Sequence, residues 1–283
     1  MNAASAVTGV LRQINSACHA ADGTRLAQLL SLRDAHVQTV HAAVPAVNVE
    51  SLARSNVRAE PAVAAIAAAH LRCAAKLMAG DFEAAFELQC KCCSEMANYV
   101  RDIEEGNWQL KPLNMIMYEL RQLAKLVEDL TSGQENKVEA ISKATRVFQD
   151  CFRAVGNDRG RGAAGSKKLG MMFIANHVLN LAFRDNNFAF VNTIMRTMKS
   201  NKDIERFQPM SHRVTFYYFM GRKSLLDAAY ESVMHNTAQE WFFFWGGGRG
   251  GNWFGLLHAH VTLANKFYFD LTIVTLIFLC FFV

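Results

Sequence analysis

Before residue 236, apolar residues recur every three or four positions, which is the spacing of an amphipathic α-helix. The first stripe consists of Val7, Val10, Leu11, Ile14 and Cys18. Alternation of the kind that predicts β-strands is nearly absent in this part of the sequence. The pattern therefore predicts an all-α fold, with no sheet before residue 236.

Short breaks that contain Gly, Pro, Asp or Asn divide this pattern into successive helices. Residues 34–60 carry a looser pattern, and Pro61 is a favourable first-turn residue for the long Ala-rich helix that follows. Gly80 is expected to end this helix, Asp81 to cap the next one, and Phe82 to pack the two together. Further helices are predicted over residues 108–130, 138–155, 166–183, 209–220 and 225–234.

The organisation of these helices predicts an irregular solenoid of antiparallel helix pairs. Residues 184–188 (RDNNF) resemble the earlier Gly-Asp-Phe corner, but the spacing between the two corners does not give a clean period. We therefore divide the chain into N-terminal helices (1–60), a helical-repeat region (61–235) and a tail of different character (236–283).

Composition and charge agree with a folded helical chain. Of 283 residues, 51% are hydrophobic, 19% are charged and only 4 are proline, which favours long helices around a sizeable core. The formal net charge of +5 lies before residue 236, because the two basic and two acidic residues after it cancel. A modest basic excess suits an acidic protein or a nucleic acid backbone as partner.

The seven cysteines form no recognisable disulfide framework, and their odd number predicts reduced thiols in the cytosol or nucleus. Cys90, Cys92 and Cys93 cannot all lie on one side of a helix, so we interpret them as ordinary helix cysteines rather than zinc ligands. Nucleophile, metal and paired-carboxylate motifs are absent from the sequence. The sequence predicts no catalytic residue, no metal, no cofactor and no enzymatic activity.

A glycine-rich segment at residues 160–165 (GRGAAG) matches the dinucleotide-binding pattern GxGxxG. That motif requires a preceding strand, whereas the preceding pattern here is helical. Ser166 stands where a phosphate-binding P-loop needs lysine. We therefore interpret the segment as a flexible loop between helices.

Basic residues near this loop and near the aromatic run FYYF (216–219) are candidates for partner binding. They are Lys167, Lys168, Arg213, Arg222 and Lys223. As a group they would form a surface for an acidic protein or for phosphates. The alternative is that they are solvated and that the aromatic rings, which have helical spacing, form core.

The tail lacks any amphipathic period. Residues 241–254 read WFFFWGGGRGGNWF, and residues 267–283 are apolar with Asp270 as their only charge. Two interpretations stay open. The last segment is a tail anchor, although it is shorter than the roughly 20 apolar residues of a usual span, or the tail is translated intron or a shifted reading frame.

Several short blocks together resemble the PCI-domain-containing protein 2 family. In order, they are AAHLRC (68–73), the Asp81-Phe82 corner, Asn107-Trp108, CFR (151–153), SKKLGM (166–171) and SHRVTFYYFMGRKSLL (211–226). The resemblance covers roughly residues 5–235 and also extends to proteins similar to COP9 signalosome subunit 12. Within it we assign structural motif positions to Asp81, Phe82, Trp108 and Gly221.

This resemblance implies a right-handed, TPR-like superhelix of helix pairs capped by a winged helix. It also implies a non-enzymatic subunit of the TREX-2 complex, which couples transcription to mRNA export, in the nucleus, at the nuclear pore and in the cytoplasm. The implied partners are a large scaffold protein and a small acidic DSS-type protein, with nucleic acid bound through the winged helix.

The sequence departs from the family after residue 235, where the tail stands in place of further helices and the winged helix. We therefore expect a scaffold whose winged-helix activity is missing. Two alternatives are a membrane adaptor anchored through residues 267–283 and a PCI subunit of a complex like the signalosome or the proteasome lid.

Overall fold

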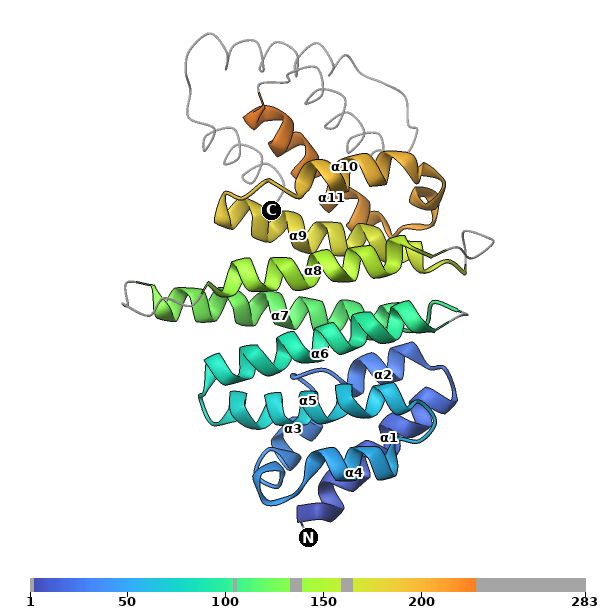
Figure 1. The fold of residues 1–283 in the computed structure, drawn as a ribbon, viewed down its shortest axis with the longest axis vertical. Helices are drawn as coiled ribbons and strands as arrows, with labels where there is room; N and C mark the ends of the chain where they lie inside the picture. The colour runs from blue at the N-terminus through green and yellow to red at the C-terminus, as the bar shows by residue number, and fades with distance from the viewer. Residues whose placement is uncertain (1–2, 104–105, 133–138, 159–164, 228–283) are drawn as a thin grey trace, which may run out of the picture. The chain divides into compact units, whose positions relative to one another are not determined.

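The computed structural model describes residues 3–103, 106–132, 139–158 and 165–227. These residues form eleven α-helices and three short 3-10 helices, and no strand is found among them (Figure 1). The predicted all-α fold class is confirmed. The chain divides into two compact units, Met1–Thr237 and Ala238–Val283, and all described residues belong to the first unit.

The N-terminal part consists of one helix of 17 residues and four short ones. They are α1 (Ala3–His19), α2 (Gly23–Leu29), α3 (Ala35–Val40), η1 (Val44–Ala46) and α4 (Val49–Asn56). Helix α1 packs against α2 and α4, and α2 packs against a helix much later in the chain, α7. The stripe predicted for α1 is buried, so the amphipathic pattern identified the inner face of this helix correctly.

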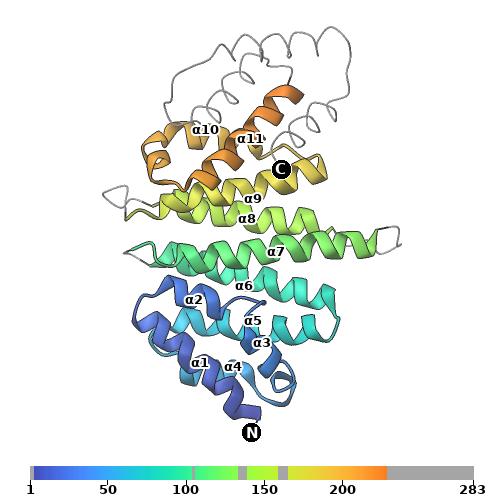
Figure 2. The same cartoon turned by 180° about the vertical axis from the view of Figure 1, so that it is seen from behind.

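Four long helices follow and pack in chain order. They are α5 (Pro61–Met78), α6 (Phe82–Asp102), α7 (Leu110–Thr131) and α8 (Ala140–Gly156). Each packs against the next, and α6 also contacts α8. Both views show these helices stacked one above another (Figures 1 and 2). The repeat type and the right hand of the superhelix stay predictions.

The last described part contains α9 (Met171–Asp185), α10 (Val191–Ser200) and α11 (Met210–Leu226). The short helices η2 (Lys167–Gly170) and η3 (Lys202–Phe207) connect them to their neighbours. Helix α9 is the centre of this part, because it contacts α7, α8, α10 and α11.

Helix α11 corrects one prediction about the helix boundaries. The sequence predicted one helix ending at Met220 and another beginning at Leu225, but α11 continues through Gly221 to Leu226. A single glycine costs only about 1 kcal/mol in a helix interior relative to alanine, and this is too little to end a helix whose other residues favour it. The remainder of the predicted second helix, residues 228–234, lies outside the described residues.

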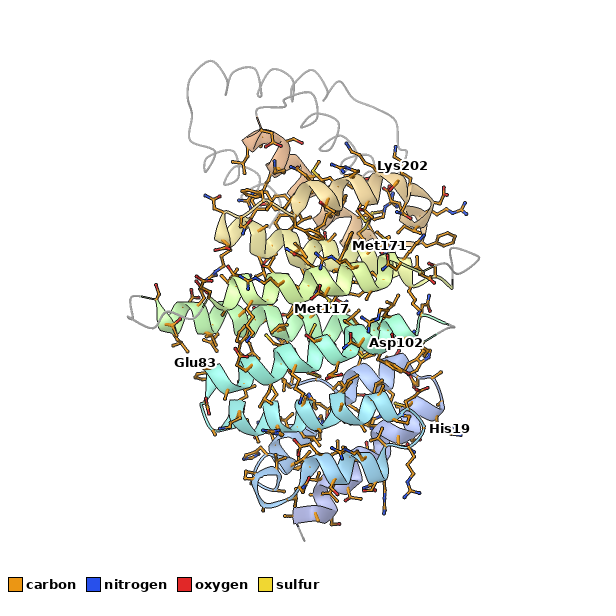
Figure 3. All side chains as sticks on the ribbon, viewed as in Figure 1. His19, Glu83, Asp102, Met117, Met171 and Lys202 are labelled. Atoms are coloured by element: carbon orange, nitrogen blue, oxygen red, sulfur yellow. The ribbon has the colours of Figure 1, made fainter. Side chains whose placement is uncertain are left out.

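A continuous hydrophobic core runs through the described unit, from Val7 in α1 to Met220 in α11. Val57 and Val63 belong to this core, so it continues across the boundary at residues 60 and 61 that the sequence suggested. Met117 in α7 and Met171 in α9 are fully buried in the middle of it (Figure 3). Each such side chain contributes roughly 1.5–3 kcal/mol of stability by leaving water.

Helix α5 alone among the described helices has the length and hydropathy of a membrane span, with 56% of its residues buried inside the structure. It contacts α3, α4 and α6, and its apolar residues belong to the common core. These contacts are those of a core helix, so its composition is explained without a membrane. The segment at residues 267–283 lies outside the described residues.

The corner between α5 and α6 has the geometry that the sequence predicted. Gly80 adopts a left-handed conformation with φ of 77°, which residues with a side chain rarely take. Asp81 then caps α6, because its Oδ1 accepts a hydrogen bond of 3.2 Å from the amide of Ala84. Phe82 packs against the core at the start of the helix.

The corner between α9 and α10 shares the left-handed residue of this arrangement but not its cap, because Phe190 precedes α10 without a side-chain hydrogen bond. Asn186 takes the left-handed position with φ of 55°, and Asn187 Oδ1 accepts a hydrogen bond of 3.3 Å from the amide of Ala189. The ring of Phe188 packs edge-on against Phe183, with centroids 5.0 Å apart. The similarity that the sequence showed between the two corners therefore holds for the left-handed residue and the packed phenylalanine, and not for the helix cap.

Trp108 joins the N-terminal helices to the beginning of α7. Its ring packs edge-on against Tyr99 with centroids 6.1 Å apart. Its carbonyl oxygen lies so close to Gly23 that a Cβ at that glycine would stand 1.9 Å from it. Beside this contact, Lys111 Nζ donates a hydrogen bond of 2.6 Å to Thr24 Oγ1. Gly23 is therefore required for α2 to approach α7.

Candidate interaction surface

Lys167 is one of the five basic residues that we predicted to bind a partner, and the structure places it inside the fold. Its side chain is only 6% exposed, and its Nζ donates hydrogen bonds to the carbonyl oxygens of Ile103 and Arg101. Asp158 accepts hydrogen bonds from Ser166 Oγ at 2.7 Å and from the amide of Lys167 at 2.8 Å. Lys167 therefore joins the end of α6 to η2, and the expectation that it lies on a surface is corrected.

Lys223 is also buried, at 7% exposure. It forms an ion pair with Asp227 one turn later, and its ammonium lies 5.7 Å from the ring centroid of Phe188. This position faces the corner between α9 and α10, because α11 packs against α9. The expectation that Lys223 lies on an exposed surface is therefore corrected, because its side chain is buried.

The other three predicted residues differ in their surroundings. Lys168 is half-buried, and Arg213 pairs with Glu205 at 3.6 Å. Arg222 is exposed, with its guanidinium 4.4 Å from the ring centroid of Phe183. The five residues therefore do not form the uniform basic surface that the sequence suggested, although partner binding by those that are accessible stays a prediction.

The aromatic run at residues 216–219 is divided between core and surface. Phe216 and Phe219 are buried, Tyr217 is half-buried, and Tyr218 is 44% exposed. Tyr217 donates a hydrogen bond of 2.6 Å from its hydroxyl to Glu205. The interpretation that these rings form core before they form a stacking platform is confirmed for the two phenylalanines.

All six cysteines of the described residues are buried. Cys90, Cys92 and Cys93 are buried together because α6 is covered by α5, α7 and α8. Burial raises the pKa of Cys90 to about 12, so its thiol stays protonated at neutral pH. Within the described ranges, no group of three His, Cys, Asp or Glu is placed to hold a metal ion.

The glycine-rich loop ends a helix rather than a strand. Helix α8 ends at Gly156, and residues 159–164, which carry most of the GxGxxG match, lie outside the described residues. A dinucleotide site requires a strand before the glycines. The helical context that argued against such a site is therefore confirmed up to Asp158.

Glu119 is a buried carboxyl group that the sequence analysis missed. Its Oε1 accepts hydrogen bonds of 2.9 Å from Ser31 Oγ and from the amide of Leu32. Burial raises the pKa of Glu119 to about 7, although the two hydrogen bonds act in the opposite direction. The carboxyl group holds the end of α2 against α7, and its partners lie too far away in sequence to be predicted.

His36 and His70 form a second polar contact between distant segments. Their Nε2 atoms lie 3.1 Å apart, and His36 Nδ1 lies 2.9 Å from Asp34 Oδ1. Complete burial lowers the pKa of His70 to about 3, so this ring is neutral at neutral pH. The contacts from Asp34 through His36 to His70 connect α3 to α5, and His70 is the histidine of the AAHLRC block.

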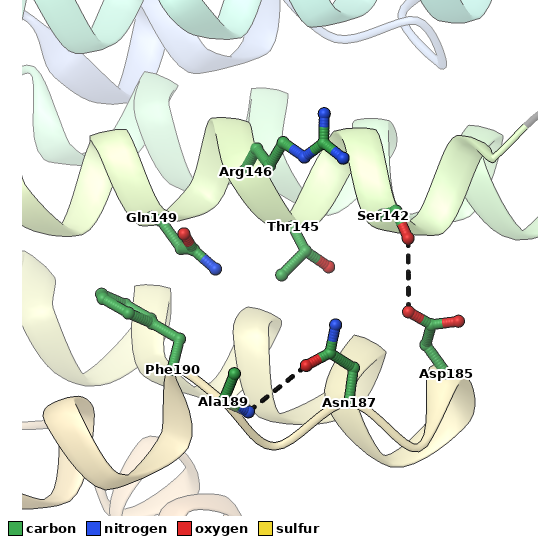
Figure 4. Close-up of a pocket in the computed structure, with 8 residues that line it drawn as sticks. All are labelled: Ser142, Thr145, Arg146, Gln149, Asp185, Asn187, Ala189 and Phe190. Carbon is green, nitrogen blue, oxygen red and sulfur yellow. Dashed lines mark hydrogen bonds between the residues drawn. The ribbon is translucent and has the colours of Figure 1, made fainter.

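A shallow recess of about 330 Å³ lies between α8 and the corner that precedes α10 (Figure 4). Its lining residues are Ser142, Thr145, Arg146, Gln149, Asp185, Asn187, Ala189 and Phe190. Ser142 Oγ donates a hydrogen bond of 3.4 Å to Asp185 Oδ2 across the recess. Ser142 has only the exposed carboxylate of Asp185 beside it, and among the described residues no histidine, cysteine or lysine lines the recess, so its geometry does not indicate an active site.

A further basic feature lies on α7 and α9, where Arg121 and Lys125 of α7 and Arg184 of α9 follow one another along one side of α7. Arg121 and Lys125 stand one turn apart on α7, and Arg184 on α9 pairs with Asp129 of α7. The guanidinium of Arg121 lies 5.3 Å from the ring centroid of Tyr118, and that of Arg33 lies 5.0 Å from it. We call Arg121, Lys125 and Arg184 the α7–α9 cation cluster.

Comparison with known proteins places this chain among relatives of one kind. It is 27% identical over 225 residues to PCI domain-containing protein 2 of Xenopus laevis, and 28% identical over 225 residues to that of Danio rerio. It is 26% identical over 228 residues to the homolog of Drosophila melanogaster. The predicted family resemblance is confirmed.

The matches to PCI domain-containing protein 2 cover 78% to 79% of this chain but only 55% to 56% of the three relatives. The chain therefore spans about half the length of these curated relatives. No protein-family profile matches the chain. The relatives' name supports a helical PCI-type scaffold, and it says nothing of a reaction.

Proposed function

We propose that this chain is a non-enzymatic scaffold subunit of a TREX-2-type complex that couples transcription to nuclear mRNA export. The observation that carries the proposal is the similarity to PCI domain-containing protein 2 over more than three quarters of the chain. The link to mRNA export comes from the family that the sequence blocks resemble.

The chemistry of the described residues supports a scaffold. Buried polar side chains of the protein join one helix to another. Glu119 joins α7 to the end of α2, and Lys167 joins η2 to α6. A solenoid of stacked helices offers extended faces rather than an enclosed cavity, and extended faces are suited to binding other chains.

The partners that we propose are a large scaffold protein and a small acidic protein, in the nucleus with access to the nuclear pore and cytoplasm. Exposed basic side chains such as Arg222 provide charge complementarity to an acidic partner. Binding of nucleic acid through a winged helix is left out of the proposal, because the described residues contain none.

Affinity purification of the tagged full chain from nuclear extract tests this proposal. Recovery of a large scaffold and a small acidic protein of TREX-2 type is the expected result. Recovery of signalosome or proteasome-lid subunits instead would overturn the assignment to an export complex. Retention in the membrane fraction after carbonate extraction would support the membrane adaptor in its place.

Nucleotide binding, as a nucleotide-using enzyme would require, is tested separately. If a nucleotide is a ligand of this chain, saturating ATP or NAD raises its melting temperature, because any ligand that binds only the folded state stabilises it. We expect no change with either nucleotide. A saturable increase would contradict the proposal.

A further inference from the structure

The α7–α9 cation cluster is not neutralised by the residues around it. Among the residues that the structure describes, Lys125 forms no ion pair, and Arg121 contacts the ring of Tyr118 but forms neither a hydrogen bond nor an ion pair. Arg121 is more than half buried, and its Nε is buried without a hydrogen-bond partner. A guanidinium in such a position normally has an anionic partner.

The electrostatics of the cluster also indicate that negative charge is lacking around the three cations. Burial lowers the pKa of Lys125, and repulsion from Arg121 and Arg184 lowers it further. Three cations and the single carboxylate of Asp129 leave a local charge of +2. The buried ring of His177 nearby is neutral, because burial and these cations lower its pKa to about 3.

Acidic residues on the same elements are engaged elsewhere. Glu119 of α7 binds Ser31 and Leu32, and Glu128 Oε2 accepts a hydrogen bond from the amide of Ile141 at the start of α8. Asp185 of α9 accepts a hydrogen bond from Ser142. These three carboxylates therefore have hydrogen-bond partners other than the cations of the cluster.

The aromatic side chain at the cluster argues against a nucleic acid base as the occupant. The guanidinium groups of Arg33 and Arg121 both lie over the ring of Tyr118. The hydroxyl of Tyr118 accepts a hydrogen bond of 3.2 Å from Arg33. Single-stranded nucleic acids bind by stacking bases on free aromatic faces, and this ring is already covered by cations.

We propose that the α7–α9 cation cluster binds a phosphoserine or phosphothreonine side chain of a partner polypeptide. A phosphate monoester carries roughly −1.5 to −2 charges at pH 7 and presents three acceptor oxygens. This charge matches the local +2, whereas one carboxylate would neutralise only half of it. Arginine clusters recognise phosphorylated side chains for this reason. The proposal goes beyond the scaffold function and does not depend on which complex contains the chain.

Fluorescence anisotropy with the full chain tests the proposal. The probe is a labelled peptide, Gly-Gly-phosphoserine-Gly-Gly, and the matched probe carries unmodified serine. We expect saturable binding of the phosphorylated peptide and none of the other. Arg121→Gln and Lys125→Gln should each weaken binding about tenfold, because each removes a charge-assisted hydrogen bond to the phosphate.

The control variant is Lys143→Gln, which removes the same charge from α8. Lys143 is paired with Glu87 on α6 and has no place in the cluster. We expect less than about a twofold change in affinity, since the general field of one exposed lysine is screened within a Debye length of about 8 Å. An equal loss in Lys143→Gln and Lys125→Gln would mean non-specific attraction and would overturn the proposal.

A second measurement separates binding from folding. Because the cations repel one another, Lys125→Gln should keep or raise the melting temperature in the absence of phosphate while it weakens peptide binding. A variant that loses binding and also unfolds would instead assign the cluster a structural role. Equal binding of the two peptides, or tighter binding of a five-nucleotide oligouridine than of the phosphorylated peptide, would likewise overturn the proposal.

Discussion

At the scale of single residues, Glu119 and His70 are buried ionisable groups whose neighbours lie far away in the sequence. Glu119 Oε2 has no hydrogen-bond partner, whereas Oε1 accepts two hydrogen bonds, so the proton belongs on Oε2. His70 is neutral in the fold, with Nδ1 unpaired. Folding therefore makes the free energy of unfolding depend on pH through both groups, in opposite directions.

The contribution of Glu119 is isolated by the variant Glu119→Gln. Its pKa is raised from 4.5 to about 7, so its stabilisation is fully present below pH 4.5 and is lost as pH rises through 7. The stability of the wild type relative to Glu119→Gln should therefore fall by up to about 3 kcal/mol across this window. Urea unfolding of both proteins at several pH values measures the difference, and a constant difference would contradict it.

The contribution of His70 has the opposite sign. Its pKa is lowered from 6.5 to about 3, so its stabilisation is present above pH 6.5 and is lost as pH falls toward 3. The pH dependence of the wild type alone mixes this effect with that of Glu119. The effect of Glu119 is therefore measured as the difference in stability between the wild type and Glu119→Gln, because the contribution of His70 is the same in both proteins.

Gly23→Ala tests the close approach of α2 to the start of α7. The new Cβ would lie 1.9 Å from the carbonyl oxygen of Trp108, so the two helices would have to separate. We expect a loss of about 3 kcal/mol, at the upper end of the usual cost of overpacking. Gly9→Ala is the matched control, because nothing lies within 4 Å of its Cβ and α-helical alanine is favoured by about 1 kcal/mol. If chemical denaturation gives Gly23→Ala and Gly9→Ala the same free energy of unfolding, the contact between Gly23 and Trp108 is not rigid.

At the scale of helices and corners, neighbouring residues in the sequence were enough to predict most helices and one of the turns between them. The corner at Gly80 and its cap by Asp81 were predictable, since left-handed conformations and side-chain caps depend on adjacent residues. The continuation of α11 through Gly221 was not, because tertiary packing outweighs the weak preference of one glycine. The spacing of Arg121 and Lys125 places them on one face of α7, and this follows from the sequence. That Arg184 of α9 lies near them follows only from the packing of α9 against α7.

The first corner should accept the residue that the second corner uses. Gly80→Ala places a Cβ in a left-handed conformation and should cost about 1–2 kcal/mol. Gly80→Asn should cost less, because asparagine tolerates this conformation and occupies it at position 186. Thermal unfolding of the two variants compares them under the same conditions. Equal losses would show that space at the corner, and not its backbone conformation, sets the cost.

At the scale of the whole described unit, the continuous core predicts that helices distant in sequence lose stability together. Phe148 of α8 is fully buried in this core. Phe148→Ala should cost about 3–5 kcal/mol. Hydrogen exchange followed by mass spectrometry should then show faster exchange in α5 through α9, and not in α8 alone. Faster exchange confined to α8 would indicate that the stacked helices open independently, as in a weakly coupled repeat array.

The reactivity of the buried cysteines reports which helices of this unit have become exposed to solvent during unfolding. Burial raises the pKa of Cys18 in α1 and of Cys90 in α6 to about 12, and the thiols in α5 and α8 are also enclosed. An alkylating reagent reacts with thiolate, so each of these sites becomes reactive when its helix is exposed. A brief pulse of reagent during denaturation, followed by peptide mapping, would therefore time the exposure of four separate helices with no introduced label.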